Sequence, residues 1–100
     1  MIQMVSIQGP FDPALLTAAQ LRAARALVGL SGRELAQLAQ VGSATIKRAE
    51  ASDGALTVRF PVRLALVRAL EASGVEFIPS NGAGPGVRLR VGTPTPASPQ

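Results

Sequence analysis

Cations are the side chains of this sequence with the most evident chemistry. Nine arginines and one lysine, Lys47, stand against six acidic residues, which gives a net charge of +4 and a pI near 11.5. Lys47 and Arg48 are adjacent, and Arg59 and Arg63 follow. Arginine donates paired hydrogen bonds to phosphate oxygens and base edges, and a basic surface attracts polyanions. The composition therefore predicts a polyanionic partner.

The residue types that carry most catalysis and metal binding are missing. Cysteine and histidine are both absent, which excludes thiolate zinc sites, cysteine nucleophiles and the commonest general base. Among the six acids, Glu34 and Glu50 have structural explanations. Residues 82–86 are rich in glycine but lack the Lys-Ser/Thr and the strand-to-helix context of a phosphate-binding loop. We therefore expect no enzyme activity, no metal and no cofactor.

Four segments have the caps and apolar spacing of short helices. Residues 18–30 follow a Thr17 cap, and the Ser31-x-x-Glu34 pattern is a capping box that opens a helix over residues 32–39. A third helix is predicted over residues 43–51. A fourth begins with Pro61, which suits the first helical position, and ends at Gly74, which suits the residue after a helix.

The periodicity changes after Gly74. Residues 75–78 and 87–90 are strand-like runs joined by a loop rich in Gly and Pro, which predicts a β-hairpin. Residues 1–16 form an N-terminal extension, in which residues 2–7 are either a short strand or a disordered tail, and residues 92–100 are predicted to be disordered. The expected fold is mainly α, with four helices over residues 17–74 and a hairpin over residues 75–91.

The two central helices form a pair with a geometric use. The major groove of DNA is about 12 Å wide and admits one α-helix, and an eight-residue helix is about 12 Å long. Between residues 32–39 and 43–51 lies a turn of Gln40, Val41 and Gly42, in which Val41 is an apolar plug. The pair predicts a helix-turn-helix with residues 43–51 in the groove, and a plain corner of two helices is the alternative.

The same residues resemble the phage Cro/repressor (XRE-type) helix-turn-helix family. Ser31 to Ala39, Val41, Ala44-Thr45-Ile46 and Glu50 are similar to the family pattern E-L-A-x-x-x-G-V-S-x-x-T-I-x-x-x-E. A second block, L-E-A-S-G-V-E-F-I followed by G-V-R-L-R, is similar to the ends of small bacterial regulators of this family. The resemblance covers roughly residues 16–70, and it implies a sequence-specific, DNA-binding transcriptional regulator.

The resemblance also implies which residues contact DNA. The family faces base edges with the start of its recognition helix, which corresponds here to Ser43, Ala44, Lys47 and Arg48. Thr45 matches a position that often contacts phosphate, and the helix start at Ser31 and Gly32 offers backbone N–H groups to a phosphate. Arg59 and Arg63 follow the recognition helix where the DNA backbone would pass, so they are either phosphate contacts or a solvated face. Glu50 matches an acid that pairs with a basic residue, for which Arg25 and Arg33 are both candidates.

Three positions depart from the family pattern. Gln40 replaces a glycine at a residue that needs the left-handed conformation, which costs a non-glycine residue roughly 1 kcal/mol. Gly42 replaces the usual Ser or Thr cap, which leaves the helix start open between Gly42 and Ser43. Gly32 replaces a residue, often Gln, whose side chain holds a phosphate.

The partners follow from these expectations. One unit contacts about half a turn of DNA, so a homodimer on double-stranded DNA is expected, joined through the hairpin strands, residues 2–7, or Leu64 and Val67. No stretch is apolar enough to span a membrane and no signal peptide is evident, so we expect a cytoplasmic protein. The rival hypotheses are a protein-interaction module, such as an antitoxin or accessory subunit, and a nucleoid-type protein that binds DNA without sequence preference.

Overall fold

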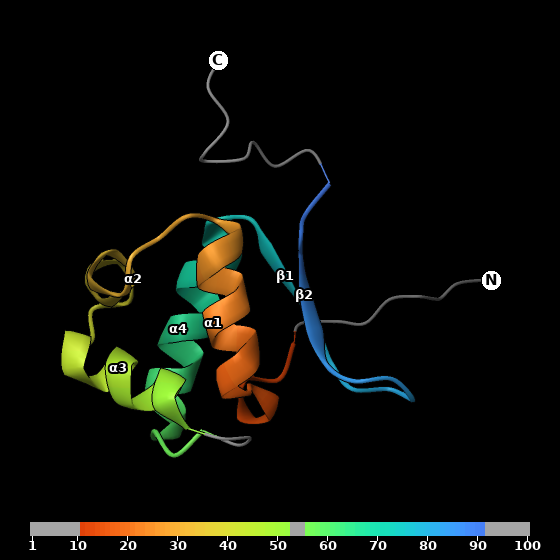
Figure 1. Ribbon diagram of the computed structural model, residues 1–100, viewed down its shortest axis with the longest axis horizontal. Coiled ribbons are helices and arrows are strands. Elements are labelled where there is room, and N and C mark those ends of the chain that lie inside the picture. Colours follow the sequence, from red (N-terminus) through yellow and green to blue (C-terminus); the bar gives the residue numbers. More distant parts are fainter. Residues whose placement is uncertain (1–10, 53–55, 92–100) are drawn as a thin grey trace.

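The computed structural model describes residues 11–52 and 56–91. Within them the chain forms a short 3₁₀ helix, four α-helices and a two-stranded antiparallel hairpin (Figure 1). In chain order these are η1 (Pro13–Leu15), α1 (Ala18–Leu27), α2 (Gly32–Ala39), α3 (Ser43–Ala51), α4 (Phe60–Ala72), β1 (Val75–Ile78) and β2 (Gly86–Leu89). The mainly α architecture with a C-terminal hairpin is confirmed. The predictions for residues 2–7 and 92–100 lie outside the described residues.

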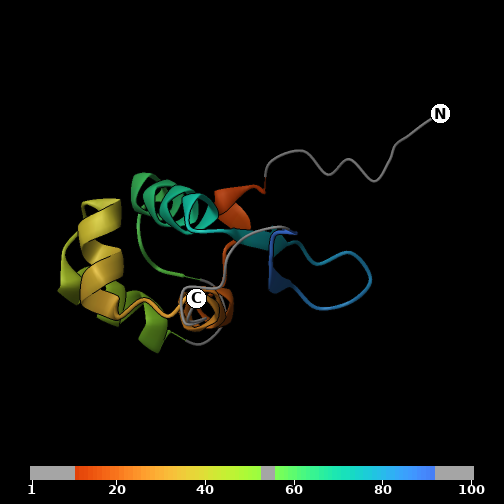
Figure 2. The same ribbon diagram turned by 90° about the horizontal axis from the view of Figure 1, so that it is seen from above.

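The pair α2 and α3 lies at one end of the molecule and the hairpin at the other, with α1 and α4 between them (Figures 1 and 2). The core joins these parts through fully buried aliphatic side chains from each of the four α-helices, among them Leu21, Leu35, Ile46, Leu66 and Leu70. Burying an aliphatic side chain of this size contributes about 1.5–3 kcal/mol. The helix pair is therefore fixed on a rigid support and has its outer surface free.

The first helix is shorter than predicted, because α1 ends at Leu27 and not at Leu30. Gly29 has a φ of 69°, in the left-handed region where glycine is favoured. The N–H of Leu30 then donates to the carbonyl of Arg25, and that of Gly29 to Ala26, which is the Schellman arrangement. The chain turns here, and this turn sets the direction in which α2 departs.

The turn between α2 and α3 is built on a left-handed glutamine. Gln40 has φ 59° and ψ 45°, the only positive φ of a non-glycine residue in the described part of the chain. The N–H of Val41 donates to the carbonyl of Ala36 at 3.0 Å, and the Val41 side chain packs against the core. The prediction that Gln40 occupies a position suited to glycine is confirmed.

Replacing Gln40 with glycine is expected to leave stability unchanged or to raise it by up to about 1 kcal/mol, because glycine relieves the left-handed strain. Urea denaturation of the two proteins measures this difference. Gln37→Gly, at an exposed position inside α2, is the matched control and should lose about 1 kcal/mol. A loss of stability in Gln40→Gly equal to that of the control would contradict this account of the turn.

The fourth helix and the hairpin follow their predicted boundaries within one residue. The helix begins at Phe60, one residue before Pro61, and Gly74 has a φ of 107° after its end. The strand β2 covers Gly86–Leu89 and not residues 87–90, because Gly86 pairs with Ile78 while the N–H of Arg90 donates to Gly74 outside the ladder. Val67 is 1% exposed within the core, so its prediction as a dimer contact is wrong.

Two buried side chains attach the hairpin to the rest of the domain: one from α1 and one from the segment before η1. Gln20 in α1 is 2% exposed, and its amide nitrogen donates to the carbonyls of Ile78 and Gly86, both at 3.1 Å. Its amide oxygen accepts the N–H of Thr17, so both ends of this buried polar group are satisfied. Phe11, which the sequence places in the N-terminal extension, is buried and stacks on Phe77 of β1 with 5.1 Å between ring centroids.

Candidate nucleic-acid interface

The start of α2 is fixed by a reciprocal cap. The Ser31 hydroxyl oxygen accepts the N–H of Glu34 at 3.0 Å, and the Glu34 carboxylate accepts the N–H of Ser31 at 2.8 Å. The predicted capping box is confirmed. The cap satisfies two of the donors at this helix start, whereas the N–H groups of Gly32 and Arg33 have no partner within residues 11–52 and 56–91. Two free donors therefore remain at the start of α2.

The helix α3 begins at Ser43, with Gly42 as its cap residue and no side-chain cap. This decides the open question about the helix start, because the Ser43 hydroxyl is not used as a cap. Ile46 and Ala49 are buried against the core. The exposed side of the helix carries the four residues predicted to face bases: Ser43, Ala44, Lys47 and Arg48. The structure thus brings these four together on one face, where a groove could receive them.

Arg48 and Thr45 lie one turn apart on that helix. The Arg48 guanidinium donates to the Thr45 hydroxyl at 3.5 Å, at the long limit of a hydrogen bond. Thr45 is half-buried and Arg48 is exposed. Arg48 is therefore held only weakly and keeps its donors available.

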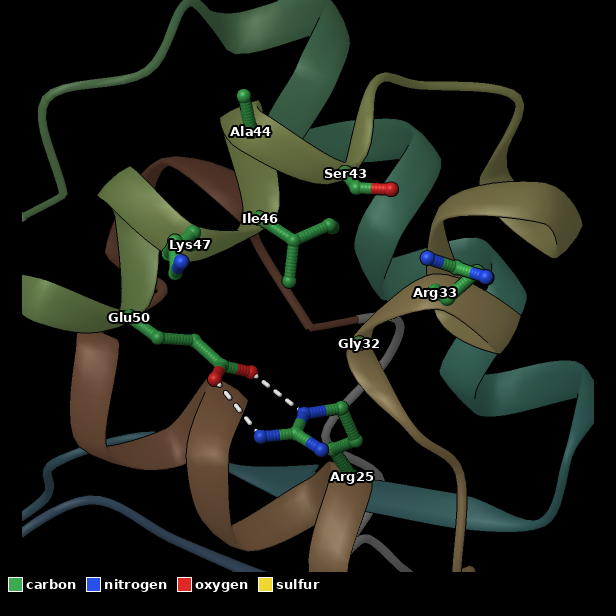
Figure 3. Close-up of a pocket in the computed structure, with 8 residues that line it drawn as sticks. All are labelled: Arg25, Gly32, Arg33, Ser43, Ala44, Ile46, Lys47 and Glu50. Atoms are coloured by element: carbon green, nitrogen blue, oxygen red, sulfur yellow. Dashed lines mark hydrogen bonds and ion pairs between the residues drawn. The ribbon is translucent and has the colours of Figure 1, made fainter.

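An ion pair fastens α3 to α1. Arg25 donates to both oxygens of the Glu50 carboxylate, at 2.7 and 2.8 Å, and to the carbonyl of Leu30 at 3.0 Å (Figure 3). Arg22 adds a bond to the backbone carbonyl of Glu50. The hydrogen bonding of Arg25 to the Glu50 carboxylate raises the pKa of the guanidinium against the opposing effect of burial, and the charge of Glu50 adds to this rise. Of the two candidate partners of Glu50, the structure thus selects Arg25.

Arg33, the other candidate partner of Glu50, lines a hollow between α2 and α3. The hollow has a volume of about 530 Å³. Figure 3 shows Arg33 on one side and Lys47 on the other, with Ile46 between them and the Arg25–Glu50 pair below. Sequence reasoning missed Arg33 as a functional candidate. The sequence held one indication of such a role. Arg33 stands two residues after a capping serine and has no acidic partner on its own helix face.

The two cations that follow α3 differ in their surroundings. Arg59 is exposed at the start of α4. Arg63 is half-buried, and its guanidinium donates to the carbonyls of Val58, Ala14 and Leu56 at 2.9, 3.0 and 2.9 Å. Arg63 thus ties the loop before α4 to η1, whereas a phosphate contact by Arg63 stays a prediction.

Arg63→Lys is expected to destabilise the fold by about 2 kcal/mol, because an ammonium group cannot span three carbonyls as the planar guanidinium does. Chemical denaturation measures this loss. Arg68→Lys, at an exposed position of α4, should change stability little. Equal stability of the wild type and Arg63→Lys would show that the three bonds contribute nothing.

The comparisons with known proteins agree with this geometry. A family model described as a helix-turn-helix domain matches residues 17–77, more than half of the chain. The chain belongs to the helix-turn-helix domain family. The match is consistent with the resemblance to Cro/repressor-type regulators, and it indicates a DNA-binding regulator of a typically non-enzymatic kind. A search of curated proteins found no match.

Metal-binding clusters and membrane-spanning helices are both absent from the described residues. Among the described residues, no cluster of acidic side chains could hold a metal ion. None of the helices in that part of the chain has the length and apolar character needed to cross a bilayer.

Proposed function

We propose that this protein is a sequence-specific transcriptional regulator that places α3 in the major groove of DNA. The observation that carries the proposal is the exposed face of α3, on which Ser43, Ala44, Lys47 and Arg48 gather while Ile46 and Ala49 anchor the helix from behind. A helix of this length fits the groove. The ion pair between Arg25 and Glu50 holds α3 at a fixed angle, so that its side chains approach bases in one orientation.

The residues of this face differ in what they can recognise. Arg48 can donate two bonds to the O6 and N7 atoms of one guanine. Ala44 can contact a thymine methyl group, and the Ser43 hydroxyl can donate or accept at either base. Phosphate contacts are proposed at Thr45, the start of α2 and Arg59, which position the protein without specifying sequence.

A two-fold dimer is part of the proposal, since one unit spans about half a turn of DNA and half-sites lie about 10 base pairs apart. Leu38 and Phe60 are 57% and 49% exposed and offer apolar surface outside the base-contacting face. Sedimentation equilibrium measures the association. A protein that stays monomeric at high micromolar concentration, with and without DNA, would overturn the dimer and leave the monomeric regulator.

Salt dependence of binding tests DNA contact against the rival hypothesis of a protein-interaction module. The logarithm of the binding constant should fall with the logarithm of salt concentration by about 0.9 for each phosphate neutralised. Fluorescence anisotropy with labelled genomic fragments measures the slope. A steep slope with unequal affinity among fragments supports the regulator. A steep slope with equal affinities would favour nucleoid-type binding, and no binding at low salt would favour the protein-interaction module.

A further inference from the structure

We infer that the hollow between α2 and α3 binds one phosphate group of the DNA backbone, held jointly by Arg33 and Lys47. The inference rests on the proposed function and refines it, because it adds Arg33 to the interface and moves Lys47 from base contact to backbone contact. Three observations carry it: the charge of the lining, the shape of the hollow and its position beside the exposed face of α3.

The lining of the hollow has a net positive charge, because its ion pair is neutral and two further cations remain. Arg25 and Glu50 neutralise each other through two hydrogen bonds. Arg33 and Lys47 then remain, and neither side chain has a hydrogen bond or an ion pair within residues 11–52 and 56–91. Two unpaired cations from different helices that line one concave space create a positive potential there, which attracts an anion such as a phosphate.

The shape of the hollow suits a sugar–phosphate unit. Its volume of about 530 Å³ lies within the range of about 300–1,000 Å³ that is typical of small-ligand pockets. Gly32 also lines the hollow, and a Cβ atom there would lie 3.7 Å from the Ile46 side chain, an ordinary contact distance. Ile46 borders the hollow and is 2% exposed.

The hollow lies where α2 approaches the start of α3, and Ser43 and Ala44 of α3 also line it. In a helix-turn-helix the first helix of the pair crosses the DNA backbone while the second enters the groove. The hollow lies between the two, and the free N–H groups of Gly32 and Arg33 lie at the helix start on the same side. Lys47 lines this space (Figure 3). Arg48, its neighbour on α3, is exposed and is not part of the lining. The two adjacent cations therefore have different targets.

Salt titrations of charge-neutralising variants test whether the two cations share one phosphate. The full-length wild type, Arg33→Gln, Lys47→Gln and the double variant are titrated against the genomic fragment that the wild type retains best. A shared phosphate predicts that the double variant loses about 0.9 from the slope, the value for one phosphate. Arg68→Gln, an exposed change outside the hollow, is the control and keeps the wild-type slope. Equal melting temperatures show that the variants fold.

Replacing backbone phosphates of that fragment one at a time with uncharged methylphosphonate locates the contact. One position should weaken binding of the wild type and have no effect on the double variant, while the base preference of both proteins stays the same. If the double variant keeps the wild-type salt slope, the inference is overturned. It is also overturned if the slope of the double variant falls by about 1.8, which indicates two separate phosphates. A changed base preference in Lys47→Gln would show that Lys47 contacts a base.

Two further outcomes separate this inference from the proposed function. If the wild type binds no DNA at all, both fall together. If the wild type binds DNA and the double variant keeps the wild-type salt slope, only the backbone contact is overturned. A rise in melting temperature with inorganic phosphate, in the wild type but not in the double variant, would then show that the hollow binds a free anion.

Discussion

Arg48→Ala is expected to weaken binding to the preferred DNA site by about 10- to 100-fold, which corresponds to the 1–3 kcal/mol of one bidentate contact to guanine. Arg48 is exposed on the outer face of α3 and is held only by a long bond to Thr45, so its donors are available for a base. Arg48→Lys should recover charge but not selectivity, because an ammonium group cannot form the paired bonds.

Anisotropy titrations with the preferred site, and with that site changed at one base pair at a time, measure this effect. Replacing one particular guanine of the site should lower the affinity of the wild type and leave that of Arg48→Ala unchanged. Arg68→Ala serves as the charge-matched control on α4. Equal preference of Arg48→Ala and the wild type at every position would contradict the assignment of Arg48 to a base.

Glu50→Gln is expected to lower the stability of the fold by about 2 kcal/mol, and the melting temperature by about 10 °C. The amide cannot accept from Arg25 through both of its atoms, so a guanidinium whose side chain is only 28% exposed keeps one of its two bonds to residue 50. Because the pair joins α3 to α1, we expect it to fix the angle of α3, so DNA affinity should fall even at temperatures where the variant is folded.

Thermal denaturation and DNA titration at a temperature well below the transition measure the two parts of this effect. Glu76→Gln is the matched control, because Glu76 pairs with Arg88 on the exposed face of the hairpin, where solvent screens the interaction. Its melting temperature should change little. If Glu50→Gln were as stable as this control and bound DNA like the wild type, the ion pair would not position α3.

Local features of the fold could be predicted from the sequence because each depends on neighbours along the chain. The capping box needs only Ser31 and Glu34, three residues apart, and the left-handed turn followed from Gln40 standing where the family has glycine. The same holds for Pro61 and Gly74 at the two ends of α4. The exposed face of α3 follows from its period, which buries Ile46 and Ala49 and leaves the residues between them outside.

The features that could not be predicted depend on contacts distant in the sequence. The choice of Arg25 over Arg33 for Glu50 is set by how α1 crosses α3, which no local pattern contains. Arg63 reaches Ala14, far back in the chain, and Phe11 joins the core only because β1 presents Phe77 to it. The hollow between α2 and α3 is likewise a product of packing, so Arg33 could not be recognised as one of its walls.

Recognition of a DNA sequence through α3 is the function proposed for this protein. Selection from genomic fragments at about 150 mM salt, near physiological ionic strength, followed by sequencing of the retained pool, tests it most directly. The wild type should enrich a two-fold symmetric motif with half-sites about 10 base pairs apart. Lys47→Ala/Arg48→Ala should lose that motif. Absence of retention, or retention without any motif, would contradict sequence-specific recognition by this helix.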